Sequence, residues 1–496
     1  MSLKQNFMYS SILTVSTYLF PLLVYPYVSR VLGLSNIGIV NFVDNLINYF
    51  VCISMMGIAT VGVREIAAAR NDKERLSRTF MSLLSLTAIT TLIAVIALWI
   101  AMYTVPTLAE HRELLYVGIV KLSFNLLLIE WFFTGMEDFR YITNRSILVK
   151  CLYVLCVFLF VKDASDYKVY YVLSVAMVVV NALINVVYSR RFIRYSFRSI
   201  DMRPFLRAYI IMGIYVLLIN VYYSLNTVWL GFVTDTDEVG YFTTATKLHT
   251  IIMAVLSSFT NILYPRVSSL LAQGKEEEFW HKITVSLEAV FLFAFPTIAF
   301  MLVAGPQLLY LVVGGGFEGS YLPLRIITPL VLIIGVEQIF VIQILMSRHQ
   351  DNAVLRNCFL GAVISLLFNV ALTASLGAPG SAIVWVAAEF SILCLSLADV
   401  HRKFHYAFPY RRVLAYTVAY LPLVALSCLL YHVLSTSLSP NFSSSHFLNS
   451  TFSESLILSI SIATLTFVYA CFTEVFVLKN KVALYLLQSV HLHPKQ

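Results

Sequence analysis

Long apolar stretches separated by short polar connections fill almost the whole chain. Most of them approach the ~20 residues that a helix needs to cross the hydrocarbon core of a membrane. Strands of a membrane barrel would instead alternate polar and apolar positions over ~10 residues. The pattern predicts an all-α polytopic membrane protein with about 14 transmembrane helices. The fourteen stretches run approximately over residues 7–29, 37–60, 79–104, 113–134, 142–161, 169–188, 208–230, 239–263, 283–304, 325–346, 354–375, 380–399, 413–434 and 455–478.

Polar side chains follow one face of several of these predicted helices. In the second helix, Asn41, Asn45 and Asn48 stand three or four positions apart, and Asp44 belongs to the same stripe. Asn220 is part of a similar stripe in the seventh helix. A polar group in a membrane span is costly unless it faces protein or a water-filled cavity. We expect these residues to line a polar cavity, although ordinary hydrogen bonding between packed helices is the simpler alternative.

Charged residues also fall inside the predicted spans. At a rise of 1.5 Å per residue, Asp44, Lys121 and Lys247 lie roughly 10–12 Å below the outer surface. Glu337 is nearer mid-span, and Glu130 is nearer the inner end. The outer layer would then hold one lysine from each half of the chain and an aspartate. Alternatively, Asp44 pairs with Lys121 only to neutralise two buried charges.

Other charges lie close to helix ends. Arg30 and Arg325 stand at predicted outer ends, where an arginine either reaches to the membrane interface or guards a cavity mouth. Arg64 closes the second helix on the inner side. Glu389 is interpreted as a structural partner of Lys403 or Arg402.

Composition and charge support the membrane class. Hydrophobic residues make up 59% of the chain and charged residues only 12%, whereas soluble domains carry roughly a quarter charged residues. In the predicted topology, 27 of the 34 Lys and Arg residues fall on the side that holds both termini. Positive charge marks the cytoplasmic side, so both termini are predicted to be cytoplasmic. Topology then explains the net charge of +8, and nucleic-acid binding is not needed.

Motifs of soluble catalysis are missing from the sequence. There is no P-loop and no HExxH pattern, and the seven cysteines lack metal-ligand spacing. We therefore expect no cofactor and no metal site. The longest predicted outward loop, residues 435–454, is rich in Ser and Asn and has a single acid, Glu454. A membrane-embedded polymerase or ligase would be expected to carry a larger outward loop with paired charged residues.

A division into repeats is suggested near residue 200. The predicted cytoplasmic stretch Ser189–Arg207 carries six arginines. Leu32-Gly33 ends the first helix, and Leu230-Gly231 ends the seventh, about 200 residues later. Transporters are often built from such repeats, with the substrate site at the repeat interface. The sequence predicts six-helix lobes at 1–195 and 196–400, and a further helix pair with a cytoplasmic tail at 401–496.

Ordered motifs resemble those of Wzx-type O-antigen and capsular polysaccharide flippases, over roughly residues 5 to 400. The motifs are Pro26-Tyr27-Val28-Ser29-Arg30-Val31-Leu32-Gly33, Gly57-Ile58, Arg64-Glu65-Ile66-Ala67, Glu130-Trp131-Phe132, Gly135-Met136-Glu137, Gly240-Tyr241, Lys247-Leu248 and Tyr264-Pro265-Arg266. The resemblance places the chain in the multidrug/oligosaccharidyl-lipid/polysaccharide exporter superfamily. One departure is Asn226-Thr227, where the family often has an Asp-Lys pair.

The resemblance implies two six-helix lobes around a central cavity, working by alternating access in the bacterial cytoplasmic (inner) membrane. The implied substrate is undecaprenyl-pyrophosphate-linked oligosaccharide, moved from the inner to the outer leaflet. Membrane lipid is an implied partner, and a glycan polymerase and chain-length components are further candidate partners. A flippase moves its substrate without catalysing a covalent reaction.

The intramembrane charges fit such a substrate on their own. A pyrophosphate is a concentrated anion, which basic groups in a wet cavity would neutralise. The candidate substrate residues are Arg30, Arg64, Lys121, Lys247, Arg325, Asn41, Asn45 and Asn220. The candidates for carrying a coupling ion, H⁺ or Na⁺, are Asp44, Glu130 and Glu337. A cation-coupled multidrug antiporter, the main alternative, would need an acid-dominated cavity.

Overall fold

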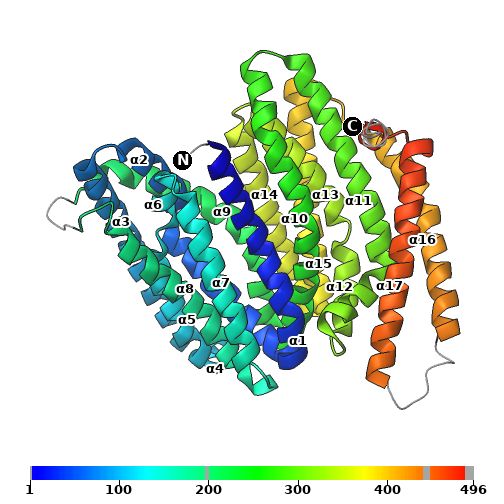
Figure 1. Cartoon of the computed structure of the whole chain (residues 1–496), viewed down its shortest axis with the longest axis horizontal. Helices are drawn as coiled ribbons and strands as arrows, with labels where there is room; N and C mark the ends of the chain where they lie inside the picture. Colours follow the sequence, from blue (N-terminus) through cyan, green and yellow to red (C-terminus); the bar gives the residue numbers. More distant parts are fainter. Residues whose placement is uncertain (1–2, 196–199, 439–446, 486–496) are drawn as a thin grey trace, which may run out of the picture. The chain divides into compact units, whose positions relative to one another are not determined.

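The computed structural model describes residues 3–195, 200–438 and 447–485. The described chain is almost entirely helical and contains no β-strand (Figure 1). It divides into two compact units, Met1–Gly240 and Tyr241–Gln496. The boundary falls inside one helix, α10, at a different point from the lobe boundary expected near residue 200. The division into two six-helix lobes and a helix pair stays a prediction.

Eleven helical stretches of the described residues are long and apolar enough to cross a membrane. Two of them, Ile12–Met55 and Asp351–Phe404, have 44 and 54 residues. At 1.5 Å per residue, both are more than twice as long as a ~30 Å hydrocarbon core requires. Both contain a glycine with positive φ, Gly33 at +76° and Gly377 at +61°, where the helix is interrupted. Each stretch therefore has the length and the break expected of two crossings, and the exact count of fourteen stays a prediction.

Unit 1 is organised around α1, which contacts α3, α5, α7 and α9. Its aromatic core lies where α3 and α6 meet: Phe80 stacks on Trp131 with 5.5 Å between ring centroids and meets the edge of Phe132 at 5.1 Å. Tyr209 of α9 lies within 3.0 Å of Thr90 on α3, oxygen to oxygen. The helices are α1 Leu3–Met55, α2 Ile58–Ala69, α3 Lys73–Thr104, α4 Pro106–Glu110, α5 Arg112–Asn125, α6 Glu130–Gly135, α7 Phe139–Phe160, α8 Tyr167–Ser189 and α9 Arg203–Val233.

Unit 2 contains the rest of α10 and the helices after it. The π-helical segments Ile339–Met346, Asn369–Thr373 and Thr473–Val477 continue α13, α14 and α17. Such segments often mark functional sites, because the extra residue per turn re-aims the side chains around it. The helices are α10 Thr236–Ala272, α11 Glu276–Val313, α12 Tyr321–Ile327, α13 Leu330–Gln338, α14 Asp351–Phe368, α15 Ala374–Phe404, α16 Tyr410–Leu438 and α17 Phe447–Phe472.

The last two helices, α16 and α17, pack against each other and against α11 (Figure 1). A buried polar cluster joins them. Glu474 accepts hydrogen bonds from the hydroxyls of Tyr416, at 3.0 Å, and Tyr420, at 2.8 Å. Arg412 forms an ion pair with Glu288 of α11 at 3.3 Å. The helix pair predicted as an addition is thus anchored to unit 2 by both apolar packing and paired charges.

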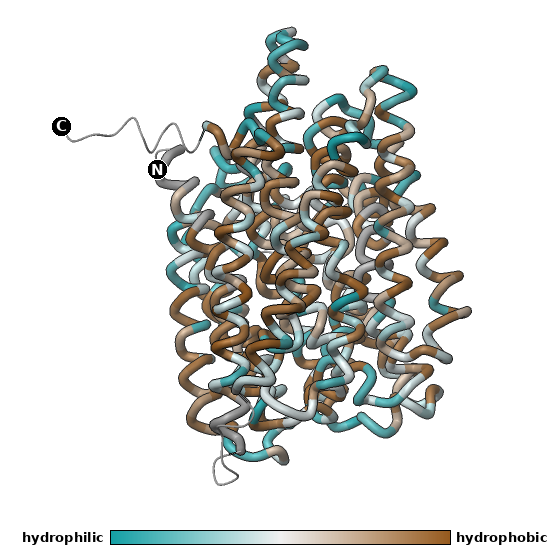
Figure 2. Tube along the Cα trace, turned by 90° about the vertical axis from the view of Figure 1, so that its right-hand side faces the viewer, coloured by the Kyte–Doolittle hydropathy of each residue, from teal (hydrophilic) through white to brown (hydrophobic). Residues whose placement is uncertain are grey.

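Hydrophilic residues gather toward the ends of the helices, and hydrophobic residues dominate their middle portions (Figure 2). At the start of α3, the Asp72 carboxylate accepts hydrogen bonds from the backbone N–H groups of Glu74 and Arg75, so this helix end is capped. Parts of two predicted loops, residues 196–199 and 439–446, lie outside the described residues. So does the side chain of Asn220 within α9.

Candidate functional site

Unit 1 brings Asp44 and Lys121 into direct contact. The Lys121 ammonium donates to Asp44 Oδ1 at 2.6 Å and to the side-chain oxygen of Asn48 at 2.8 Å. The Asn48 amide in turn donates to Asp44 Oδ2 at 3.2 Å. The Lys121 side chain is 14% exposed and that of Asp44 is 33% exposed. The three side chains form a closed, charge-compensated group between α1 and α5.

The asparagine stripe extends this group along α1. Asn41, Asn45 and Asn48 are all half-buried, and the Asn45 amide donates to the backbone oxygen of Asn41 at 2.8 Å. Tyr153 and Tyr170 lie near Asp44 and near each other. The stripe was predicted from residue spacing alone. The tyrosines come from α7 and α8, so their approach to Asp44 needed the three-dimensional structure.

The remaining basic candidates of unit 1 lie in different surroundings. Arg30 is exposed on α1, shortly before Gly33. Arg64 on α2 has a 60% exposed side chain and pairs with its neighbour Glu65 at 2.9 Å. Within the described residues, Arg64 forms no ion pair or hydrogen bond with Asp44 or Lys121. The predicted basic set of this half is therefore not gathered into one cluster.

Glu130 has a clear local partner. Its carboxylate accepts from Arg145 at 2.6 Å, and the Arg145 side chain is only 4% exposed. Arg145 also donates to Asn185, which in turn accepts from the hydroxyl of Tyr141 at 2.9 Å. Removing Glu130 would leave a buried guanidinium with less compensation, which is costly. In this geometry, Glu130 compensates the charge of the buried Arg145.

Unit 2 contains a close pair of acidic residues, whereas the Asp44–Lys121 pair of unit 1 joins an acid to a base. The carboxyl groups of Glu337 on α13 and Glu389 on α15 lie within hydrogen-bonding reach of each other. Glu389 is 1% exposed and accepts from the indole N–H of Trp385 at 3.0 Å. Trp385 also meets the edge of the buried His249 ring, 5.2 Å away. Two carboxyl groups this close repel when both are charged.

The partner predicted for Glu389 was wrong. Lys403 donates to the side chain of Gln350 at 2.6 Å, and Glu389 faces Trp385 and Glu337. The spacing of Trp385 and Glu389, one helical turn apart, was the signal in the sequence that could have indicated their contact. His249 was not predicted either, because a single histidine in an apolar helix resembles an ordinary core residue.

The two predicted basic residues of unit 2, Lys247 and Arg325, lie on different helices and differ in exposure. Lys247 is half-buried on α10, two residues before His249. Arg325 is exposed on the short helix α12. No group of three or more His, Cys, Asp or Glu residues with metal-binding geometry occurs in the part of the chain that the structure describes.

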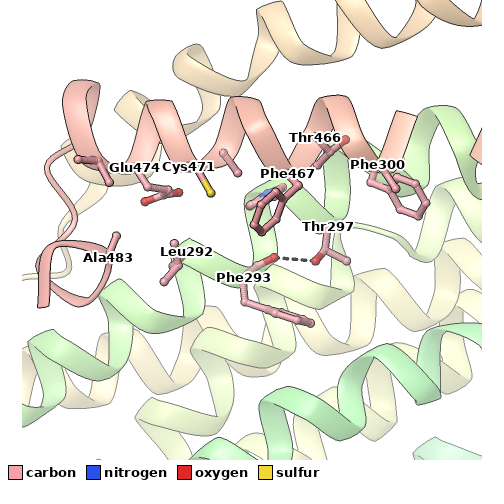
Figure 3. A pocket seen from close by; sticks show the side chains of 13 residues that line it. Leu292, Phe293, Thr297, Phe300, Thr466, Phe467, Cys471, Glu474 and Ala483 are labelled. Atoms are coloured by element: carbon pink, nitrogen blue, oxygen red, sulfur yellow. Dashed lines mark hydrogen bonds between the residues drawn. The ribbon is translucent and has the colours of Figure 1, made fainter. Parts of the chain in front are cut away.

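A groove of about 720 Å³ lies between α11 and α17 (Figure 3). Its walls are mainly apolar, with Leu292, Phe293 and Phe300 on α11 facing Phe467 on α17 (Figure 3). Glu474 is the only charged residue of its lining, and its carboxylate is already bound by two tyrosines. Such a surface suits a long hydrocarbon chain better than a polar solute.

Sequence comparison identifies the family. The model of a family described as polysaccharide biosynthesis proteins matches residues 3–271, more than half of the chain. The chain belongs to this family. It is also 26% identical, over 406 residues, to a putative O-antigen transporter of Escherichia coli (strain K12). That match covers 81% of this chain and 98% of the relative. The flippase family that the sequence motifs resemble is thus confirmed.

Structure comparison places the fold. The lipid II flippase MurJ, in an inward closed conformation, superposes with a TM-score of 0.75 at 12% identity and covers 95% of this chain and 98% of its own. An outward-facing multidrug resistance MATE family transporter of the MOP superfamily has a TM-score of 0.52 at 14% identity. That match covers 78% of this chain and 92% of the transporter's chain. The chain is a helical multi-pass protein of the bacterial inner membrane.

Proposed function

We propose that this protein moves a polyprenyl-pyrophosphate-linked oligosaccharide from the inner to the outer leaflet by alternating access. The supporting observation is the extent of the structural match. The lipid II flippase covers 95% of the chain, and the MATE transporter covers 78%. The difference is close to the length of the segment from Tyr410 to the C-terminus, which holds α16 and α17. A fold that includes this helix pair favours a lipid-linked substrate over the small cations of a multidrug antiporter.

The groove beside that helix pair supports the same substrate class. A polyprenyl chain is long and apolar, and the groove between α11 and α17 is a long apolar surface. Helix α17 forms one of its two walls and α11 forms the other (Figure 3). We place the prenyl chain on this surface, where it stays in contact with lipid while the polar headgroup moves.

Lys121 is the basic residue best placed to meet the pyrophosphate. An ammonium group has three N–H donors, and Lys121 uses two of them on Asp44 and Asn48. Asp44 and Asn48 hold the Lys121 ammonium in place, and the third N–H remains for a phosphate oxygen. The amides of Asn41 and Asn45 on the same face would exchange hydrogen bonds with sugar hydroxyls. Lys247 and the exposed Arg30, Arg64 and Arg325 would receive the anion in other states of the cycle.

We infer that the coupling ion is a proton and that the Glu337–Glu389 pair carries it. Asp44 and Glu130 each have a cationic partner, Lys121 and Arg145. Glu337 instead faces another carboxyl group, which favours a shared proton over two negative charges. Loss of that proton would create repulsion inside unit 2, and a conformational change of the lobe would relieve it.

Genetic complementation tests the transport proposal. The gene is deleted in its host, and lipid-linked oligosaccharide in the inner leaflet is measured together with surface polysaccharide. Accumulation inside with loss outside, restored by the wild-type gene and not by Lys121→Gln or Lys247→Gln, is the expected result. Arg75→Gln, an exposed arginine at the start of α3, is the matched control. Normal surface polysaccharide with new sensitivity to cationic compounds would instead identify a drug antiporter.

A further inference from the structure

The connection between α15 and α16 is unusually basic and aromatic. Residues 401–412 contain four Arg or Lys, two His and four aromatic residues, and no Asp or Glu. They lie on the side of the membrane that the charge distribution predicts to be cytoplasmic. Basic residues near this interface attract the anionic headgroups of inner-leaflet lipids, each contributing roughly fivefold in affinity.

This connection has a fixed shape. His405 adopts a left-handed backbone conformation, with φ of +56°, and so ends α15. Tyr406 then stacks on Trp280, with 4.7 Å between ring centroids, and Phe408 packs on Phe340 at 5.8 Å. The aromatic contacts hold the segment against α11 and the π-helical end of α13. Its cations are therefore presented at set positions.

Two of the four cations form no ion pair with a residue that the structure describes. Arg412 pairs with Glu288 at 3.3 Å, and Lys403 donates to Gln350 at 2.6 Å. Arg402 and Arg411 are exposed, and neither forms an ion pair with any residue in the described part of the chain. A ligand anion would meet these two arginines without displacing an existing carboxylate.

An apolar groove begins beside them. It has a volume of about 620 Å³ and lies between α13, α15 and the start of α16. On α15 it runs from His401 to Phe390, which is about 16 Å at 1.5 Å per residue. Leu332 and Val336 of α13 form the facing wall. Arg402 and Arg411 each follow a groove-lining residue in the chain, His401 and Tyr410.

We propose that this groove is a binding site for an anionic phospholipid of the inner leaflet. Its phosphate would lie at Arg402, Arg411 and His401, and one acyl chain would fill the groove toward Phe390. Charge complementarity distinguishes this site from the groove between α11 and α17, whose only charged lining residue is the acid Glu474. The site is separate from the residues proposed to bind the transported substrate.

Native mass spectrometry of the purified full chain tests the proposal with two probes, phosphatidylglycerol and phosphatidylcholine of identical acyl chains. We expect the wild type to retain phosphatidylglycerol at least tenfold better, and Arg402→Gln/Arg411→Gln to lose the preference. The matched control, Arg75→Gln/Arg140→Gln, removes two exposed arginines from unit 1 and should keep it. No preference in the wild type, or an equal loss in the control, would overturn a localised site.

A second variant separates the groove from the headgroup contacts. Leu397→Trp fills the groove and leaves every cation in place. We expect it to lower phosphatidylglycerol retention at least fivefold. If it binds as well as the wild type, no acyl chain occupies the groove and the proposal is wrong.

The native cysteines allow a test without any substitution. Cys394 is exposed and lines the groove, whereas Cys151 is exposed on α7 in unit 1. The full chain is treated with a membrane-permeant maleimide, and the modification rate of each cysteine is read by peptide mapping. Phosphatidylglycerol should slow modification of Cys394 severalfold and leave Cys151 unchanged. Equal protection by phosphatidylcholine, or no protection of Cys394, would contradict the proposal.

Discussion

Two buried charged sites, Asp44–Lys121 in unit 1 and Glu337–Glu389 in unit 2, are built in opposite ways. In unit 1, the ammonium of Lys121 lies 2.6 Å from the carboxylate of Asp44, so each charge compensates the other. In unit 2, Glu337 faces a second carboxyl group, that of Glu389. An opposite-charge pair keeps its charges over a wide pH range, whereas a like-charge pair is sensitive to proton supply. This difference is the basis for proposing substrate-anion contact in unit 1 and proton exchange in unit 2.

The largest expected effect comes from breaking the pair in unit 1. Asp44→Ala leaves Lys121 charged in a setting where its side chain is only 14% exposed. Removing one partner of a buried pair costs 3–5 kcal/mol, and we expect about 2 kcal/mol here because Asp44 is partly exposed. Thermal unfolding of the purified protein in detergent, read as the apparent free energy of unfolding, measures the loss.

The double variant Asp44→Ala/Lys121→Met is the control for this loss. It removes both charges, so it should recover most of the stability while transport stays abolished. If the double variant also restores surface polysaccharide in the deletion host, Lys121 does not contact the substrate. The pair would then serve only to hold α1 and α5 together.

The length of the apolar stretches was enough to predict the helical membrane fold. Residue spacing was enough to predict the asparagine stripe, because it repeats with the period of one helix. The depth of Asp44 and Lys121, counted along their own helices, also indicated that they share a layer. Contacts between helices were harder to predict from the sequence. Glu389 was assigned to Lys403 or Arg402 because these residues follow it in the chain near the inner edge of the membrane. Spacing along one helix did not indicate that α13 brings Glu337 beside Glu389. Whether two buried charges meet depends on helix rotation, which the spacing of single helices does not determine.

A smaller effect on stability is expected from the acid pair. Glu389→Gln keeps an oxygen that can accept from the Trp385 indole, and it replaces a carboxyl that shares a proton by a neutral amide. Stability should change by less than about 1 kcal/mol, whereas the dependence of transport on a proton gradient should disappear. Transport into vesicles at a series of imposed pH gradients measures this. Unchanged gradient dependence in Glu389→Gln and in Glu337→Gln would remove proton exchange from unit 2.

Glu389→Leu tests the hydrogen bond with Trp385, which Glu389→Gln keeps. It removes the acceptor as well as the proton site, so the Trp385 N–H loses its partner in a buried position. An unsatisfied buried donor costs roughly 1–3 kcal/mol. Stability should therefore fall in Glu389→Leu and not in Glu389→Gln. Equal stability of the two variants would mean that the Trp385 hydrogen bond contributes nothing to holding α15.

The smallest effect on stability is expected from breaking an ion pair that is exposed to solvent. Lys168 donates to Glu113 at the surface of unit 1, with side chains 50% and 76% exposed. Solvent and salt screen such pairs, and holding two long side chains in one geometry opposes the attraction. Lys168→Gln should leave the melting temperature and transport unchanged, at low and at high salt. A loss of stability as large as that of Asp44→Ala would show that burial does not determine how much an ion pair contributes to the free energy of unfolding. The difference between the two buried sites would then have no consequence for stability.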